Sequence, residues 1–312
     1  MLTISKLKRS SVSYYIDTAK AAGGRASSDL QRASGGLGGE YYSEHETRTP
    51  PMWLCAGDTH TAARLVGLTD VQRAGGEADS VVVARWLDDG IAPNGARGRA
   101  FGNRGVHGFD LTFAAPKKSV SLLRALRADD VVQKAIAAAH STAIAEAMEY
   151  LAAHAGYTRV HNSVTGEKDL VKLPGLVAVA YQHETSRCGD PHLHTHVILP
   201  NRQARSDGGA LVSIDGTSLY HEARAAGVIY QATLRRQLHQ SLGIEWAPVD
   251  PGTGMAEAAG VDRDTITAWS RRSSQLREWA AHNLVSVDGP LSAAQLAAAQ
   301  KATRPAKPEE LA

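Results

Sequence analysis

Two β-forming runs joined by a tight turn constrain the fold of this chain most. Residues 176–183 and 194–199 are rich in apolar and β-branched side chains, and the turn-forming letters RCGDP lie between them. This arrangement predicts two antiparallel strands. A third run, GFDLTFAAP from Gly108, alternates apolar with polar residues and ends at Pro116, as a half-buried strand does. We therefore expect an antiparallel sheet with one core face and one face available for chemistry.

Helical patterns account for much of the remaining chain. The Ala-rich segment 129–155 has apolar residues at helical spacing, which predicts one long amphipathic helix packed on the sheet. A short first strand is indicated by the alternation around Leu2 and Ile4, and the Gly/Ser-rich residues 23–39 predict a mobile loop. Five more segments are expected to be helical: 10–22, 58–68, 78–88, 218–242 and 264–283.

Composition limits the class of protein. Of 312 residues, 43% are hydrophobic and 21% are charged, which is typical of a soluble globular protein. The formal net charge of +2 does not indicate a nucleic-acid partner, although basic residues gathered on one face would not alter that total. With only Cys55 and Cys188, a disulfide framework is excluded and a reducing cytoplasm is favoured. No run approaches the roughly 20 apolar residues of a membrane-spanning helix, so we expect no membrane insertion.

Four of the 13 histidines lie in the single segment HETSRCGDPHLHTH. Because strand side chains alternate, His192, His194 and His196 should share one face, and the turn can return His183 to that face. Three converging imidazoles suit a divalent transition ion and leave positions for water or substrate. An isolated H-x-H is equally consistent with a solvated strand face, but a third histidine across a turn favours metal binding. Cys188, within the turn, is expected to be a bystander.

One aspartate and two tyrosine pairs complete the chemically suggestive residues. Asp110 lies on the polar face of the third run and could accept the second N–H of a metal-bound histidine, or be an ordinary surface residue. Tyr14 with Tyr15, and Tyr41 with Tyr42, are four of only nine tyrosines. A phenol, with a pKa of about 10, needs a metal and a proton acceptor to attack a phosphodiester. Packing or stacking on unpaired bases are the other interpretations.

These motifs, in this order, resemble the HUH endonuclease superfamily, most closely the conjugative relaxases of the MobF class with a TrwC-type relaxase domain. The resemblance includes GFDLTFAAPKKSVS from Gly108 and later segments such as SIDGTSLYHEA from Ser213. It implies an α/β (α+β) fold, a two-layer sandwich whose central antiparallel sheet carries the HUH site, with helices packed on the other face. It also implies a relaxase domain over residues 1–290, including the 23–39 loop and a C-terminal helical portion, and a linker over residues 291–312 leading to a helicase region.

The resemblance assigns roles residue by residue. It implies a metal triad of His183, His194 and His196 holding one divalent ion, Mg, Mn or Zn. Asp110 would lie beside the nucleophile, as its proton acceptor or as the partner that orients a histidine. Because His192 stands where relatives commonly have a non-ligand, a four-histidine site is an alternative. The tyrosine and arginine roles are Tyr14 as principal nucleophile, Tyr41 as second nucleophile, Tyr15 and Tyr42 as secondary tyrosines, and Arg187 as a contact to phosphate.

The implied function is that of a site- and strand-specific nickase. It would cleave a plasmid transfer origin, form a covalent 5'-phosphotyrosyl intermediate and rejoin the strand during conjugation. The implied partners are single-stranded origin DNA with its adjacent hairpin duplex, relaxosome accessory proteins and a type IV coupling protein, all in the cytoplasm. A rolling-circle replication initiator or transposase is the nearest alternative, although the tyrosines precede the histidines here. A metal-dependent hydrolase of small molecules, with no use for Tyr14, and a DNA-binding module without catalysis are the others.

Overall fold

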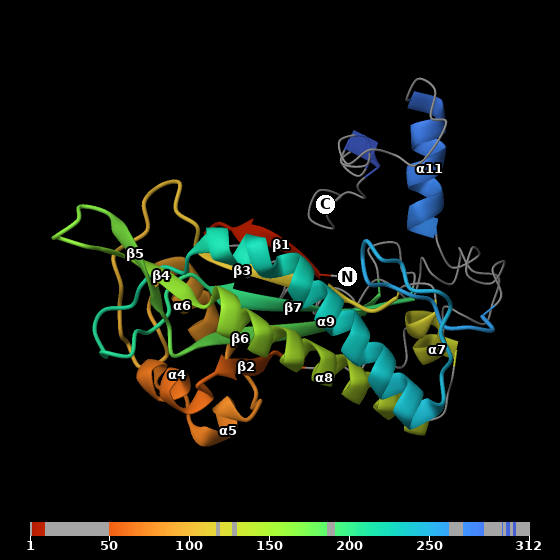
Figure 1. Cartoon of the computed structure of the whole chain (residues 1–312), viewed down its shortest axis with the longest axis horizontal. Coiled ribbons are helices and arrows are strands. Elements are labelled where there is room, and N and C mark those ends of the chain that lie inside the picture. Colours follow the sequence, from red (N-terminus) through yellow and green to blue (C-terminus); the bar gives the residue numbers. More distant parts are fainter. Residues whose placement is uncertain are drawn as a thin grey trace.

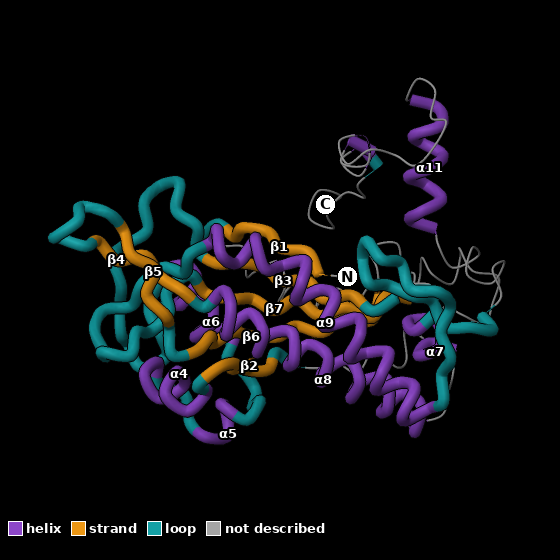
Figure 2. Tube along the Cα trace, in the orientation of Figure 1, coloured by secondary structure: helices purple, strands orange, loops and turns teal. Residues whose placement is uncertain are grey.

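A central antiparallel sheet organises the molecule (Figures 1 and 2). The computed structural model describes residues 2–9, 50–116, 119–126, 130–185, 191–261, 271–283, 295, 298, 299, 302 and 303. The sheet has five strands in the order β1-β3-β7-β6-β2, and each neighbouring pair is antiparallel. Its strands are β1 (Leu2–Leu7), β2 (Met52–Gly57), β3 (Gly108–Ala114), β6 (Gly175–Thr185) and β7 (Pro191–Pro200). The expected sheet, including its first strand, is confirmed.

Two long helices cover one face of this sheet. They are α8 (Asp130–Ala155) and α9 (Gly216–Leu242), which pack against each other and against the strands (Figure 1). The Asp215 carboxylate caps the first turn of α9 by accepting the Ser218 backbone N–H, and the helix ends at Gly243 in the left-handed conformation, as is common at helix ends. The core under the two helices includes Leu111, Phe113, Met148, Leu151, Val197, Tyr230 and Leu234.

Three shorter helices cover one end of the opposite face. They are α4 (Thr59–Val66), α5 (Asp70–Arg73) and α6 (Ser80–Asp89), and they enclose a second cluster around Trp53 and Trp86. On β6 this cluster extends as far as Tyr181, and on β7 it begins at Ile198. The next residues along the same face are the histidines. The two-layer sandwich therefore carries an additional partial layer that ends beside the candidate site.

The observed helices can be compared with the helical segments predicted from the sequence. The predicted helices of segments 58–68, 78–88, 129–155 and 218–242 are confirmed as α4, α6, α8 and α9. A further helix, α7 (Val120–Leu126), follows β3, and α11 (Arg271–Asn283) confirms the described part of segment 264–283. Segments 10–22 and 23–39 lie outside the described residues. None of the described helices combines the length and apolarity that crossing a bilayer requires.

Strand β2 and a two-stranded hairpin were not predicted from the sequence. The hairpin joins β4 (Tyr157–His161) to β5 (Lys168–Lys172) and projects from one end of the molecule (Figure 1). Its polar side chains do not alternate with apolar ones, so it has no period-two pattern. In β2, Trp53 and Leu54 pack into different clusters on the two faces of the sheet. A strand buried on both faces shows a continuous apolar run and not an alternation.

Candidate metal centre

Three histidines from two neighbouring strands converge on the sheet face opposite α8 and α9. His183 lies near the end of β6 and is directly paired in register with His194 on β7, and His196 follows two residues later. One nitrogen from each ring lies within 4.8 Å of the corresponding nitrogens of the other two. Metal–imidazole bonds are about 2.0–2.1 Å long, so small side-chain adjustments would let one ion bind all three.

Hydrogen bonds orient two of these rings. His196 Nδ1 lies 3.0 Å from both carboxylate oxygens of Asp110. His194 Nδ1 lies 2.7 Å from the backbone carbonyl oxygen of His192. Each acceptor requires that Nδ1 carry the proton, which assigns Nε2 of both rings as the coordinating nitrogen. The sequence analysis predicted that Asp110 could accept the second N–H of a metal-bound histidine, and the structure places it beside His196.

His183 supplies the most direct test of whether the site fits a metal. Its Nε2 atom is buried and has no hydrogen-bond partner within the described part of the chain. Burial, with smaller contributions from neighbouring His194 and His196, lowers the pKa of this imidazole to about 3, against the opposing charge of Asp110. The ring is therefore neutral at neutral pH, the form that binds metal. A buried nitrogen without a partner is costly, and a bound ion would satisfy it.

Asp110 and Thr112 form the support beneath His196. Asp110 is only 6% exposed, so its interpretation as an ordinary surface residue is wrong. Thr112 Oγ1 donates to Asp110 Oδ1 at 3.1 Å and also lies 3.1 Å from His196 Nδ1. Sequence reasoning did not single out Thr112. Its signal was the position two residues after Asp110 on the same face of the predicted strand.

His192 contacts this centre without joining the ligand group. Its ring stacks on that of His194, with centroids 4.6 Å apart and planes at 29°, so the two share a face as predicted. Among the described residues, the group with ligand spacing consists of His183, His194 and His196. The geometry therefore favours a three-histidine centre over the four-histidine alternative.

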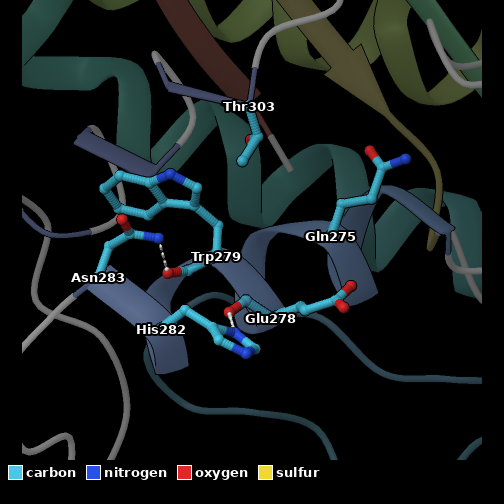
Figure 3. A pocket seen from close by; sticks show the side chains of 6 residues that line it. All are labelled: Gln275, Glu278, Trp279, His282, Asn283 and Thr303. Atoms are coloured by element: carbon cyan, nitrogen blue, oxygen red, sulfur yellow. Dashed lines mark hydrogen bonds between the residues drawn. The ribbon is translucent and has the colours of Figure 1, made fainter.

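The other expected site residues lie outside the described part of the chain. These are Tyr14, Tyr15, Tyr41, Tyr42 and Arg187. Cys188, the expected bystander, also lies outside the described residues. A separate cavity of about 570 Å³ is lined by five α11 residues and Thr303 (Figure 3). Within it, His282 Nδ1 donates to the Glu278 carbonyl and Asn283 Nδ2 to the Trp279 carbonyl. None of its lining residues belongs to the expected site.

Comparisons with known proteins agree with this geometry. The family model described as TrwC relaxase matches residues 8–312. The multifunctional conjugation protein TraI of Escherichia coli is 36% identical over 213 residues, which cover 65% of this chain and 11% of that protein. The chain thus spans about a tenth of the length of this curated relative.

Solved structures of a conjugative relaxase are similar over nearly the whole chain. The relaxase TrwC in complex with oriT DNA, in a copper-bound structure, has a TM-score of 0.75 and 29% identity, covering 98% of this chain and 92% of that one. TrwC complexed with a 27-mer DNA comprising the recognition hairpin and the cleavage site has a TM-score of 0.70 and 27% identity, covering 98% of this chain and 91% of that one. The fold and the ordered motifs thus point to the same family.

Proposed function

The chain belongs to the TrwC relaxase family, and on that premise we propose that it is a site- and strand-specific DNA nickase and transesterase acting at a plasmid transfer origin. The observation that carries the proposal is the triad of His183, His194 and His196, with Asp110 orienting one member. It lies on a sheet similar to that of a relaxase solved with oriT DNA. Such a centre suits chemistry on a phosphodiester.

The three imidazoles would hold one divalent ion. When bound, it acts as a Lewis acid that neutralises charge developing on the scissile phosphate. Mg, Mn and Zn are the candidates, and a relative was solved with copper bound. Availability in the cell would select among such ions. The protein itself supplies the orientation of His194 and His196 and the neutral state of His183. Asp110 fixes the tautomer of His196, and burial keeps His183 unprotonated.

Tyr14 is the proposed nucleophile. Its phenol oxygen attacks the scissile phosphorus, forming a Tyr14–phosphate ester, and the bond from phosphorus to the 3' oxygen of the preceding nucleotide breaks. The departing oxygen takes a proton and becomes a 3'-hydroxyl, while the phenol proton passes to a base. The phosphotyrosyl ester keeps the energy of the original linkage, so reversal of the attack rejoins the strand without ATP.

Asp110 is assigned first to orientation. It already accepts hydrogen bonds from His196 and Thr112. Proton acceptance from Tyr14 is the second candidate role. Tyr41 would act as a second nucleophile during termination, with Tyr15 and Tyr42 as secondary tyrosines.

The proposed partners follow from this assignment. The substrate would be single-stranded origin DNA with its hairpin duplex, since a structural relative was solved with a 27-mer comprising a recognition hairpin and the cleavage site. Arg187 would contact a phosphate of that strand. Relaxosome accessory proteins and a type IV coupling protein, in the cytoplasm, complete the proposed context.

The decisive experiment looks for a covalent protein–DNA adduct. Single-stranded oligonucleotides tiled across the non-coding DNA beside the chain's own gene would be incubated with Mg²⁺ or Mn²⁺, and adducts mapped by mass spectrometry. We expect one oligonucleotide to become attached to Tyr14. Tyr14→Phe should still bind that oligonucleotide but form no initial adduct, whereas Tyr15→Phe should be much milder.

Each rival gives a different result. A small-molecule hydrolase would form no adduct, and its activity would survive Tyr14→Phe. A binding module without catalysis would retain the oligonucleotide without cutting it. An adduct on Tyr41 or Tyr42 would keep the nickase chemistry but overturn the assignment of Tyr14.

A further inference from the structure

A buried histidine lies behind the metal centre, on the other side of the sheet. His140 of α8 is completely buried in the core between the sheet and the two long helices. Its Nδ1 lies 2.7 Å from the Tyr230 hydroxyl of α9, and its Nε2 lies 2.9 Å from the Thr195 hydroxyl of β7. Both ring nitrogens are therefore hydrogen-bonded, and they connect α8 and α9 to one strand residue.

Thr195 places this connection directly beside two of the metal ligands. Thr195 stands between His194 and His196, and strand alternation directs its side chain to the helix face while theirs point to the metal face. It is 3% exposed and is paired in register with Phe113 of β3 and Gln182 of β6. Its hydroxyl is thus an attachment point on the backbone segment that carries both ligands.

The strand pairing beside this segment is irregular. The register between β6 and β7 is regular up to His183 and shifts between His183 and Thr185. The hydrophobic pattern and the turn normally fix the register of a strand, and a bulge disrupts the ladder of backbone hydrogen bonds locally. An anchor from the helix layer at Thr195 restrains β7 next to the irregularity.

The chemistry of His140 is that of a neutral, directional spacer. Burial, with smaller contributions from His194 and Arg124, lowers the pKa of its ring to about 3. One nitrogen therefore donates and the other accepts at neutral pH, which the hydroxyls of Tyr230 and Thr195 can match in either direction. An apolar side chain would fill the same space without desolvating a polar group. What the imidazole adds is a fixed distance between α8 and β7.

We propose that His140, held by Tyr230, is a positioning residue that fixes Thr195 and thereby sets the spacing of His194 and His196 on the opposite face of β7. The inference rests on the proposed metal site but not on the identity of the DNA substrate. It predicts that metal affinity depends on a network that never touches the metal. Partners behind metal ligands commonly contribute about 10- to 100-fold in affinity, and for this more distant network we expect the lower end, about 10-fold.

The test separates positioning from simple stability. Co²⁺ binding to the metal-free protein would be titrated by visible absorption, and unfolding followed by denaturant, for His140→Leu, Thr195→Val and the triple variant His140→Leu/Thr195→Val/Tyr230→Phe. The single variants leave buried hydroxyl or imidazole groups unpaired and should lose stability. In the triple variant all three partners are apolar, so stability should return towards that of the parent. Co²⁺ affinity should nonetheless stay about 10-fold below the parent, with an altered absorption band.

Ile144→Ala is the matched control, because Ile144 lies one turn along α8 in the same core and is also buried. It should lower stability and leave Co²⁺ affinity unchanged. Recovery of parental affinity in the triple variant, or an equal loss in Ile144→Ala, would reduce His140 to a packing residue. Failure of the parent itself to bind Co²⁺ would instead count against the metal centre and hence against the proposed function.

Discussion

The two faces of β7 have different roles, apolar packing on one face and metal ligation on the other. On the helix face, Leu193, Val197 and Leu199 are almost completely buried among apolar neighbours. On the other face, His194 and His196 point into a polar centre whose members are held by hydrogen bonds. Apolar packing is non-directional and tolerates small shifts, whereas metal coordination requires fixed nitrogen positions. The strand therefore needs packing on one side and orientation on the other.

Thr195 is the exception that links the two faces. It lies on the packed side but is held by a directional bond from His140. Stability and metal affinity should therefore respond differently to substitutions on the two faces. Substitutions at four sites test this difference, and they follow in order of their expected effect on metal affinity.

His196→Ala should have the largest effect. It removes a ligand, so metal affinity should fall by more than about 100-fold, beyond the range of supporting partners, and nicking should be lost, as it should on chelation of the parent. Metal titration and an oligonucleotide cleavage assay provide the measurements. His192→Ala is the matched control and should bind metal nearly as well as the parent, because the backbone carbonyl that orients His194 remains. Full nicking by rigorously metal-free protein would contradict the assignment.

Asp110→Ala should come next. Without an acceptor for His196 Nδ1, metal affinity should fall about 10- to 100-fold. Asp110→Asn keeps an acceptor oxygen, so its affinity should stay closer to that of the parent, and at saturating metal its cleavage should stay within about 10-fold. A rate loss of about 100- to 10,000-fold in Asp110→Asn at saturating metal is the size expected for a missing general base. That result would move Asp110 to the proton-acceptor role.

Thr112→Val should have a smaller effect on affinity. The substitution removes one hydrogen bond to Asp110 but leaves the two contacts from His196. A net contribution of about 1 kcal/mol for such a bond corresponds to roughly fivefold in metal affinity. Thr112→Ser, which keeps the hydroxyl, should restore most of it. If Val and Ser variants bind metal equally, Thr112 has no part in orienting the centre.

The sequence indicated the residues on the metal face of the site but not His140 behind it. Because strand side chains alternate, spacing placed His192, His194 and His196 on one face with His183 opposite them on the neighbouring strand, and Asp110 on the polar side of β3. The choice of His183, His194 and His196 as the triad came from the family resemblance. His140 carries no comparable signal. A histidine within an Ala-rich helix is indistinguishable from a surface residue until α8 is placed over β7, because the contact spans 55 residues of sequence.

The missed strands have a related cause. Period-two patterns reveal strands with one buried and one solvated face. The pattern was present in β1 and β3, whereas β6 and β7 were predicted as β-rich runs joined by a turn. It was absent from β2, which is buried on both faces, and from the β4–β5 hairpin, which is mostly polar. Sequence reasoning therefore found the strands that carry the site, together with β1, and missed β2 and the β4–β5 hairpin.

Leu193→Ala should have the smallest effect on metal affinity and a large effect on stability. Leu193 is 1% exposed, lies on the helix face of β7 and directly precedes His194. Removing its side chain should lower the free energy of unfolding by about 2–5 kcal/mol. Its backbone remains tied to neighbouring segments, because its N–H donates to Ser121 Oγ and its carbonyl accepts from Ala115. Since the backbone path of β7 is kept and the Thr195 anchor is untouched, the folded variant should bind metal as the parent does. Denaturant unfolding and metal titration on the same sample give the comparison. If metal affinity falls in proportion to the free energy of unfolding, the two faces of β7 do not have separate effects on stability and metal binding.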